Sequence, residues 1–347
     1  MEALTTSWCS PSNIALVKYW GKFPGQLPAN PSISFTLKES VTYFDITAKI
    51  KNHDADKKLS IDFFFEGAMS PKFQEKIENF LLTVVDKFPW LVNYHLTLNS
   101  KNTFPHSSGI ASSASSMSAL CLCLLSLDEK IQAKKISPES FFKQASNLSR
   151  VASGSASRSV YAPIVSWGEL SGVLASDNEH AALIDLKGIN PIFTNYCDSI
   201  IIVDAGTKSV SSRAGHKLME NHPFKDERFK RARLNCQKIL QAMKEGDLKS
   251  FIEVVEEEAL MLHALMMTSE PSYILLKPNS LLVIEKLRDF RQKTSIPVCF
   301  TIDAGPNIHV LYPEKYKIEV INWLHIEFVD FAIIHDEIGS GPIQLKE

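Results

Sequence analysis

A serine-rich loop that leads directly into an apolar helix constrains the fold of this chain more than any other stretch. Residues 104–127 read FPHSSGIASSASSMSALCLCLLSL. Gly109 permits a positive φ or a close approach of the backbone to a ligand. The first turn of the following helix has unpaired N–H groups, and its macrodipole attracts anions. The pattern predicts a phosphate-binding loop made by Ser107, Ser108, Gly109, Ser112 and Ser113, with the Ser112 or Ser113 hydroxyl available to nucleotide-bound Mg²⁺.

The same loop has a second interpretation, because serine-rich loops before helices often act only as N-caps. The stretch matches neither the G-x-x-x-x-G-K-[ST] loop nor the G-x-G-x-x-G fingerprint. Phosphate binding and simple capping therefore both remain open when the loop is considered alone.

The length of the chain favours two domains. A chain of 347 residues with 45% hydrophobic content exceeds the size at which single cores usually stop growing. We expect an N-terminal domain over residues 1–190 and a C-terminal domain over residues 191–347, with the boundary within 185–198. The net charge is −2, and the lysines and arginines are dispersed, which argues against a nucleic-acid surface. A small-molecule partner is expected instead.

Cysteine and histidine usage indicates a reduced protein without a metal site built by the protein alone. The ten histidines show no H-E-x-x-H or similar spacing. The first eight residues lack the pattern of a signal peptide, and the longest apolar stretch, 119–127, is too short to cross a bilayer. We therefore expect no membrane partner and a cytoplasmic location. Six cysteines without regular spacing are interpreted as reduced core residues: Cys9, Cys121, Cys123, Cys197, Cys236 and Cys299.

Hydrophobic periodicity predicts a mixture of strands and helices along the chain. The segment 27–37 begins as a turn and then alternates, and we expect it to pair with 41–50 as an antiparallel neighbour. Charges on the helix expected over 224–244 are interpreted as its exposed face. Further strands are expected at 59–65, 94–99, 161–167 paired with 172–175, 199–204 and 308–312, and further helices at 70–88, 137–150, 247–267 and 280–293.

Two lysines close to aromatic residues suggest an anion site. Residues 13–22 read NIALVKYWGK, a short strand expected to end at Gly21. Lys18 and Lys22 flank Tyr19 and the neighbouring tryptophan, which would partly desolvate an ammonium and favour an anionic partner. The alternative is a solvated sheet edge.

Arg158 lies within a run of small residues, SGSASRS at 153–159, ahead of an expected helix. An arginine in this setting has few local carboxylates to pair with, and its planar guanidinium suits a carboxylate or a phosphate. An arginine that satisfies distant backbone carbonyls is the alternative. The polar segment 208–213 is interpreted as a solvated loop.

Asp303 ends an apolar strand and precedes a Gly-Pro turn in VCFTIDAGPN, residues 298–307. A carboxylate held between a buried strand and a tight turn is suited to act as a general base. The alternative is an Asx-turn, in which the side chain only stabilises the turn.

Five motifs together resemble the diphosphomevalonate decarboxylase family of the GHMP kinase superfamily. They are SNIALVKYWGK, PHSSGIASSA, SGSASRSVY, VSSRAGH and FTIDAGPN, they occur in the family's order, and the resemblance covers roughly residues 7–312. The resemblance implies an α+β GHMP kinase fold, with an N-terminal domain like ribosomal protein S5 domain 2 and a ferredoxin-like C-terminal domain, in a homodimer. It also implies that ATP and Mg²⁺ are used to convert mevalonate 5-diphosphate to isopentenyl diphosphate, CO₂, ADP and phosphate.

Residue roles follow from the resemblance, position by position. Asp303 would act near the 3-hydroxyl of the substrate, and Arg158 would hold its carboxylate. The implied catalytic residues are Asn13, Lys18, Arg158, Ser212 and Asp303. The implied substrate-binding residues are Tyr19, Lys22, Ser153, Ser155 and Arg158, and the implied nucleotide-binding residues are Ser107, Ser108, Gly109, Ser112 and Ser113.

The sequence departs from the family pattern around the expected substrate pocket, for example at Phe23-Pro24, where the family often has Arg-Asp. A phosphomevalonate decarboxylase and a GHMP small-molecule kinase therefore remain as alternatives. A non-catalytic binding protein is a third reading, which the joint presence of Lys18, Arg158, Ser212 and Asp303 argues against.

Overall fold

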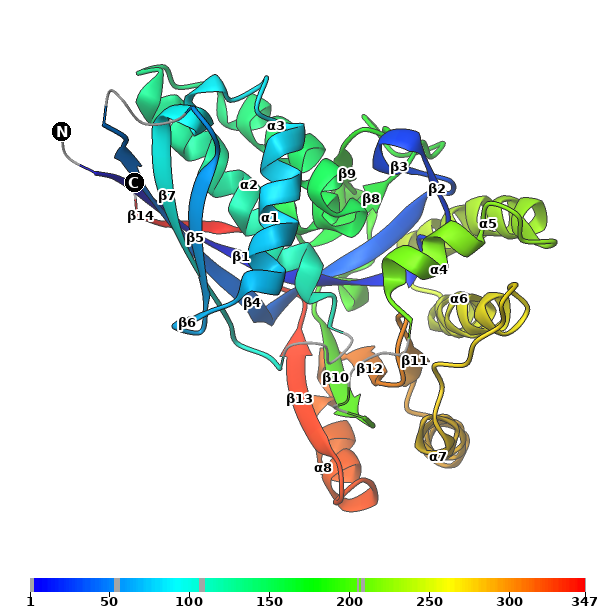
Figure 1. Ribbon diagram of the computed structural model, residues 1–347. Helices are drawn as coiled ribbons and strands as arrows, with labels where there is room; N and C mark the ends of the chain where they lie inside the picture. The colour runs from blue at the N-terminus through cyan, green and yellow to red at the C-terminus, as the bar shows by residue number, and fades with distance from the viewer. Residues whose placement is uncertain (1–2, 53–56, 106–109, 205, 207–209, 347) are drawn as a thin grey trace.

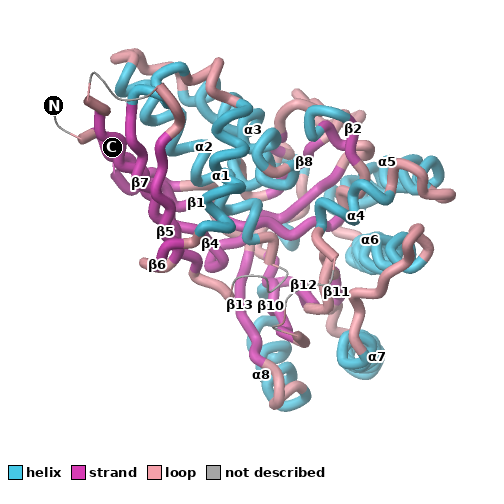
Figure 2. Tube along the Cα trace, in the orientation of Figure 1, coloured by secondary structure: helices cyan, strands magenta, loops and turns pink. Residues whose placement is uncertain are grey.

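The protein consists of two sheets that carry helices, as the computed structural model shows (Figure 1). The structure describes residues 3–52, 57–105, 110–204, 206 and 210–346. The mixture of helices and segregated, largely antiparallel strands confirms the predicted α+β class. Figure 2 shows the strands gathered in two regions, with the helices outside them.

The larger sheet has the strand order β14-β1-β4-β7-β5-β6, and β8 and β9 extend it along β4. All its pairs are antiparallel except β5 with β7. A separate pair is formed by β2 (Lys22–Phe23) and β3 (Leu27–Pro28). The strands of the larger sheet are β1 (Leu4–Val17), β4 (Ser32–Ile50), β5 (Ser60–Phe65), β6 (Ala68–Met69), β7 (Tyr94–Asn102), β8 (Ile164–Trp167), β9 (Ala181–Leu183) and β14 (Ile343–Lys346).

The prediction of two neighbouring strands over 27–37 and 41–50 was wrong, because residues 32–37 and 41–50 belong to the single strand β4. The stretch between them contains no glycine, proline or asparagine that would form a turn. The ladder with β1 shifts register there, between the pairs Pro11↔Val41 and Asn13↔Thr36. The Asp336 carboxylate accepts the N–H groups of residues 38, 39 and 40, each over 2.8 Å, so the strand continues across the shift.

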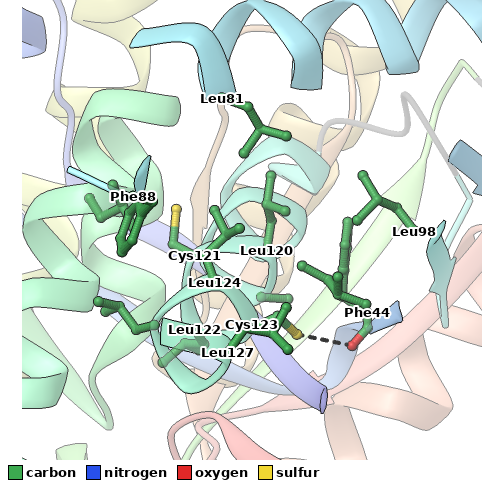
Figure 3. Close-up of a cluster of buried hydrophobic side chains, with 14 of the residues drawn as sticks. Phe44, Leu81, Phe88, Leu98, Leu120, Cys121, Leu122, Cys123, Leu124 and Leu127 are labelled. Atoms are coloured by element: carbon green, nitrogen blue, oxygen red, sulfur yellow. Dashed lines mark hydrogen bonds between the residues drawn. The ribbon is translucent and has the colours of Figure 1, made fainter. Parts of the chain in front are cut away.

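Three helices pack on the larger sheet: α1 (Pro71–Thr83), α2 (Ser112–Ile131) and α3 (Pro138–Ala152) (Figure 1). Helix α2 is apolar on nearly every side after its first turns and fills the centre of this core. Figure 3 shows its leucines and its Cys121 and Cys123 among side chains from α1 and the sheet. Helix α1 ends earlier than the predicted Phe88, because the Val84 N–H bonds the Leu81 carbonyl in a tightened last turn.

The smaller sheet has the order β11-β12-β10-β13, with all pairs antiparallel. The chain order of strand, helices, two strands, helix and strand is that of a ferredoxin-like unit. Its strands are β10 (Tyr196–Ile202), β11 (Cys299–Thr301), β12 (Ile308–Pro313) and β13 (Ala332–Glu337). Its helices are α5 (Lys225–Glu245), α6 (Leu248–Met267), α7 (Pro278–Thr294) and α8 (Lys317–Glu327), preceded by the short α4 (Ser212–Leu218).

Four further sequence predictions need correction. Residues 172–175 form turns with positive φ at Gly172 and Ala175, so β8 pairs instead with β9. Residues 153–159 do not precede a helix, because most of them form the 3₁₀ helix η3 (Gly154–Val160). The segment taken as a polar loop continues into α4. Arg228 departs from the exposed face predicted for α5, since its side chain is fully buried against Glu258.

The two sheets share one apolar cluster. Ile14 and Phe35 of the larger sheet contribute to it together with Tyr196 of the smaller sheet and Phe251 of α6. The C-terminal end of the chain returns to the larger sheet, where β14 pairs with β1. A division at residue 190 stays a prediction. None of the helices in the described part of the chain is long and apolar enough to cross a membrane.

Candidate active site

A cavity of about 440 Å³ lies where the end of β1, the start of α2, η3, the start of α4 and the turn after β11 converge. Ten of the residues predicted from the sequence line it together: Asn13, Lys18, Tyr19, Lys22, Ser113, Ser153, Ser155, Arg158, Ser212 and Asp303. Ser112 is the first residue of α2 but is not among the lining residues. Ser107, Ser108 and Gly109 lie outside the described residues.

Lys18 and Asp303 form an ion pair at the wall of the cavity. The Lys18 Nζ lies 2.8 Å from Asp303 Oδ1, with 2% of the lysine side chain and 25% of the aspartate side chain exposed. Burial lowers the pKa of Lys18, and the neighbouring Asp303 carboxylate opposes that shift. The Gly305 N–H bonds the Asp303 carbonyl over 2.7 Å, which fixes the turn after β11. The carboxylate is thus presented to the cavity with a cation beside it.

Arg158 is a buried cation whose hydrogen bonds go to neutral side chains. Its Nε donates to Asn13 Oδ1 over 3.1 Å, and its Nη1 donates to Ser32 Oγ over 2.7 Å. Asn13 is fixed in turn, because its Nδ2 donates to Ser159 Oγ over 2.8 Å. Burial lowers the pKa of Arg158 to about 10. A guanidinium in this setting would gain from an anionic ligand, since no carboxylate of the described residues hydrogen-bonds it.

Three more cations line the same cavity: Lys22, Lys76 and Arg213. Burial and the nearby Arg213 lower the pKa of Lys22 to about 8. Burial, Lys72 and Arg213 also lower the pKa of Lys76. Two lysines whose pKa values are lowered by burial and by a neighbouring arginine mark a place where a multiply charged anion would be stabilised.

The N-terminus of α2 opens into the same cavity. Its N-cap is Ala111, with φ 45°, which has no side chain that could cap the helix. The hydroxyl of Ser12 holds the preceding turn by donating to the Ile110 carbonyl over 2.6 Å. Ser113 lines the cavity, with its Oγ 3.4 Å from Ser153 Oγ. The N-terminus of a 20-residue helix whose N-cap residue makes no side-chain cap hydrogen bond, beside the Ser113 and Ser153 hydroxyls, favours phosphate binding over the simple-capping interpretation.

His216 of α4 holds the segment that follows β1, although the sequence analysis assigned it no role. Its ring lies between Tyr19, with centroids 4.4 Å apart, and Trp20, at 4.5 Å. The Gly21 N–H donates to His216 Nδ1 over 3.0 Å. Burial, Lys22 and Arg158 keep the pKa of His216 well below its usual value. A neutral imidazole therefore fixes the chain between the two predicted lysines.

Lys76 and Arg213 were also missed by the sequence analysis. Lys76 lies on α1, which buries Ile77, Phe80 and Leu81 in the core and also places this lysine in the lining of the cavity. Arg213 lies within the VSSRAGH motif, next to the predicted Ser212, so its motif was a usable signal. Only folding brings α1 next to this loop, and Lys76 therefore had no signal in its own segment.

The chemistry of the lining is strongly biased towards anions. Among its described residues, Asp303 is the only carboxylate, against the five cations Lys18, Lys22, Lys76, Arg158 and Arg213. No group of three histidine, cysteine, aspartate or glutamate side chains able to hold a metal ion occurs in the described ranges. The arrangement suits a small, multiply charged anion with a group for Asp303 to act on.

Known protein families match both halves of the chain. A family described as the diphosphomevalonate decarboxylase-like N-terminal domain matches residues 10–177, and the mevalonate 5-diphosphate decarboxylase C-terminal domain matches residues 199–344. A diphosphomevalonate decarboxylase of Ganoderma lucidum is 27% identical, covering 98% of this chain and 86% of the relative. One of Candida albicans is 26% identical, covering 99% and 98%.

Solved structures of similar proteins agree over the whole chain. The mevalonate diphosphate decarboxylase of Staphylococcus aureus has a TM-score of 0.83 and 28% identity, covering 99% of both chains. That of Enterococcus faecalis, described for its mevalonate diphosphate mediated ATP binding mechanism, has a TM-score of 0.83 and 26% identity, covering 100% of both chains.

Proposed function

Because the chain belongs to the diphosphomevalonate decarboxylase family, with its GHMP kinase fold, we propose that it catalyses the ATP-dependent decarboxylation of mevalonate 5-diphosphate. The products are isopentenyl diphosphate, ADP, phosphate and CO₂, in the mevalonate pathway of isoprenoid biosynthesis. The observation that carries this proposal is the cavity in which five cations converge on a single carboxylate, Asp303, itself paired with Lys18.

Different cations would bind the two charged ends of the substrate. Lys22 and Arg213, which both line the cavity, would bind the diphosphate, and Arg158 would bind the carboxylate. Tyr19, Ser153 and Ser155 would complete the substrate contacts, and Asn13 would keep Arg158 in place through the 3.1 Å hydrogen bond. The 3-hydroxyl would then lie near Asp303. This placement orders the reacting groups before chemistry begins.

The chemistry follows in two parts. Asp303 accepts the proton of the 3-hydroxyl as that oxygen attacks the γ-phosphorus of ATP and ADP departs. The C3–O bond then breaks, and inorganic phosphate leaves with its electron pair. The electrons of the bond to the carboxylate form the carbon–carbon double bond as CO₂ is released. Arg158 orients the carboxylate, and Ser212 helps to place the γ-phosphate at the start of α4.

ATP would bind at the start of α2, through the loop of Ser107, Ser108 and Gly109 with Ser112 and Ser113. The N-terminus of α2 and its hydroxyls fit a nucleotide with Mg²⁺, because the phosphate oxygens of the nucleotide would supply the negatively charged ligands that the ion requires. Ser112 or Ser113 would contact the ion, which would supply charge neutralisation on the phosphates. The complexes described for solved relatives contain mevalonate diphosphate, an ATP analogue and magnesium.

The proposal also includes a cytoplasmic location and a homodimeric assembly. All six cysteines are free and five are buried, which supports a reducing compartment, the cytoplasm. We expect a homodimer, as the family resemblance implies. Ile318 and Ile326 on α8 are 74% and 79% exposed, which is consistent with a self-association surface. Analytical ultracentrifugation would test this directly, and a monomer would remove this part of the proposal.

The substrate is tested with ATP, Mg²⁺ and mevalonate that carries zero, one or two 5-phosphates, with CO₂ and ADP measured separately. We expect both products from the diphosphate. ADP without CO₂ would indicate a kinase of the same superfamily, and CO₂ from the monophosphate alone would indicate a phosphomevalonate decarboxylase. Neither product from any of the three would contradict the proposed function.

A further inference from the structure

Lys18 leaves the larger sheet at the end of β1, and side chains rather than a neighbouring strand hold its peptide groups. Its N–H donates to Glu258 Oε2 over 2.9 Å. Its carbonyl accepts from Arg228 Nη2 over 2.7 Å and from Asn30 Nδ2 over 2.9 Å. Buried backbone polar groups require partners of this kind. The Lys18 backbone is therefore fixed on both sides of its Cα atom.

Glu258 of α6 and Arg228 of α5 form a bidentate ion pair with both side chains fully buried. Nη1 lies 2.8 Å from Oε1, and Nη2 lies 2.7 Å from Oε2. Asn235 Nδ2 also donates to Oε1 over 2.7 Å. Together with the Lys18 N–H, four donated hydrogen bonds reach one carboxylate. The planar guanidinium and carboxylate leave little freedom to either group.

Stability alone does not account for this pair. The desolvation of two buried charges offsets their attraction, and apolar residues of similar volume often replace such pairs without loss of stability. The Arg228 Nε adds a cost, because it finds no hydrogen-bond partner within the described part of the chain. The pair does fix the orientation of the Lys18 backbone, because Glu258 accepts its N–H and Arg228 donates to its carbonyl.

We propose that Glu258 and Arg228 are positioning residues, which hold the Lys18 backbone so that its Nζ meets Asp303 at 2.8 Å. The inference rests on the decarboxylase activity proposed above. Helix α6 holds the other partner as well, because His263 Nε2 donates to the Asp303 carbonyl over 3.1 Å. One helix thus contacts both members of the ion pair in the cavity.

The negative charge of Glu258 also acts electrostatically on the Lys18 ammonium. Burial lowers the pKa of Lys18, Asp303 and Glu258 raise it, and Arg158 lowers it further. Removal of the Glu258 charge should therefore lower the pKa of Lys18. The charged groups that face Lys18 from the elements around it are Asp303, Glu258, Arg228, Arg158 and, electrostatically, Asp198.

The decisive variant replaces the pair by apolar residues, Arg228→Met with Glu258→Leu. A matched control exists on the same helix, where Glu256 Oε1 lies 2.5 Å from Arg291 Nη1. Arg291 donates to the Val298 carbonyl over 2.7 Å. The control variant is Arg291→Met with Glu256→Leu. Thermal unfolding, kcat, KM and the dissociation constants of ATP and mevalonate 5-diphosphate are measured for both.

We expect both double variants to fold, the first with a lowered unfolding temperature because the Lys18 N–H and Asn235 Nδ2 lose their acceptor. The first should lose about 10- to 100-fold in kcat with little change in ligand affinity, because misplacement of a reacting group by about 1 Å has costs of this size. The control should keep the parent kcat. Equal kcat values for the parent and a folded Arg228→Met/Glu258→Leu variant would overturn the proposal.

A single variant covers the case in which the double variant does not fold. Glu258→Gln keeps an oxygen for the Lys18 N–H, and a flipped Asn235 amide can accept from the new amide group. The alkaline limb of its kcat profile at saturating substrate, where the titration of Lys22 no longer limits binding, should move to lower pH. A parent kcat with an unmoved limb would overturn the positioning role. Turnover by the parent is established first, so failure of the proposed function is a separate result. If the parent is inactive, the Lys18 pKa measured by NMR in parent and variant decides the inference.

Discussion

Asp303 is the residue on which the proposed chemistry depends, because it is the only carboxylate among the described residues lining the cavity. The Asp303→Asn change keeps the size of the side chain and removes its charge. We predict a fall in kcat of about 10²–10⁴-fold, the range usual for loss of a general base. Isothermal titration should show that ATP and mevalonate 5-diphosphate still bind.

A residue that only stabilised the turn would behave differently. Asparagine serves in Asx-turns nearly as well as aspartate. A folded Asn variant that binds both ligands and retains the parent kcat would return Asp303 to a structural role.

Lys22 makes substrate binding depend on pH. Its pKa is about 8 in the free protein, so its ammonium is present below that pH and is lost above it. A bound diphosphate raises this pKa, since it stabilises the charged form. The dissociation constant of mevalonate 5-diphosphate should therefore rise by about tenfold per pH unit between the free and bound pKa values.

The matching control for Lys22 is Lys22→Met. This variant should bind the substrate weakly with no such rise in the dissociation constant around pH 8. A rise of the same slope in the Met variant would assign the titration to another group, such as Lys76.

Sequence patterns could identify residues whose own segment carries an unusual signal. Asp303 precedes a Gly-Pro turn, and Arg158 is isolated among small residues, so both could be singled out before the structure was known. Lys76 has ordinary neighbours in the sequence, and His216 lies in the VSSRAGH motif but was assigned no role from it. Their place in the site results from the packing of α1 and α4 against the end of β1, which no local pattern contains.

At the scale of elements, η3 places Arg158 and Ser155 through very close packing at its first residue. A Cβ atom on Gly154 would lie 2.8 Å from Tyr19 Oη and 2.9 Å from Trp167 Cη2. Gly154→Ala should therefore destabilise the fold by about 1–3 kcal/mol through overpacking. It should also raise KM, because Tyr19 and η3 both line the site.

Gly188→Ala provides the comparison, since a Cβ atom there meets nothing within 4 Å. Thermal unfolding and KM of this variant should match the parent. If Gly154→Ala also matched the parent in unfolding temperature and KM, the close packing at Gly154 would not be what positions η3 in the site.

Helices with clear end signals were the elements that the sequence predicted best. Pro138 follows the capping Ser137 and opens α3 as expected, and α5, α6 and α7 occupy their predicted positions. The break expected near residue 40 fails for a reason outside the segment, since Asp336 from the far end of the chain bonds the strand there. Tertiary hydrogen bonds of this kind override local expectation.

At the scale of the whole molecule, the cavity exists because the two sheets pack on each other. Lys18 follows β1 of the larger sheet, and Asp303 follows β11 of the smaller one, 285 positions later. The family resemblance supplied this pairing of motifs, whereas composition alone indicated only a large core and a small-molecule partner. The shared cluster of Ile14, Phe35 and Tyr196 keeps the two sheets, and hence the ion pair, together.

The coupling of phosphoryl transfer to carbon–carbon bond cleavage is the central claim, and its stoichiometry is the most direct test. Purified protein is incubated with ATP, Mg²⁺ and mevalonate 5-diphosphate labelled with ¹⁴C at its carboxylate, and ADP and labelled CO₂ are quantified in the same samples over time. We predict that both appear in equal amounts and that both rates fall together in Asp303→Asn. ADP formation without labelled CO₂, or labelled CO₂ without ADP, would contradict the claim.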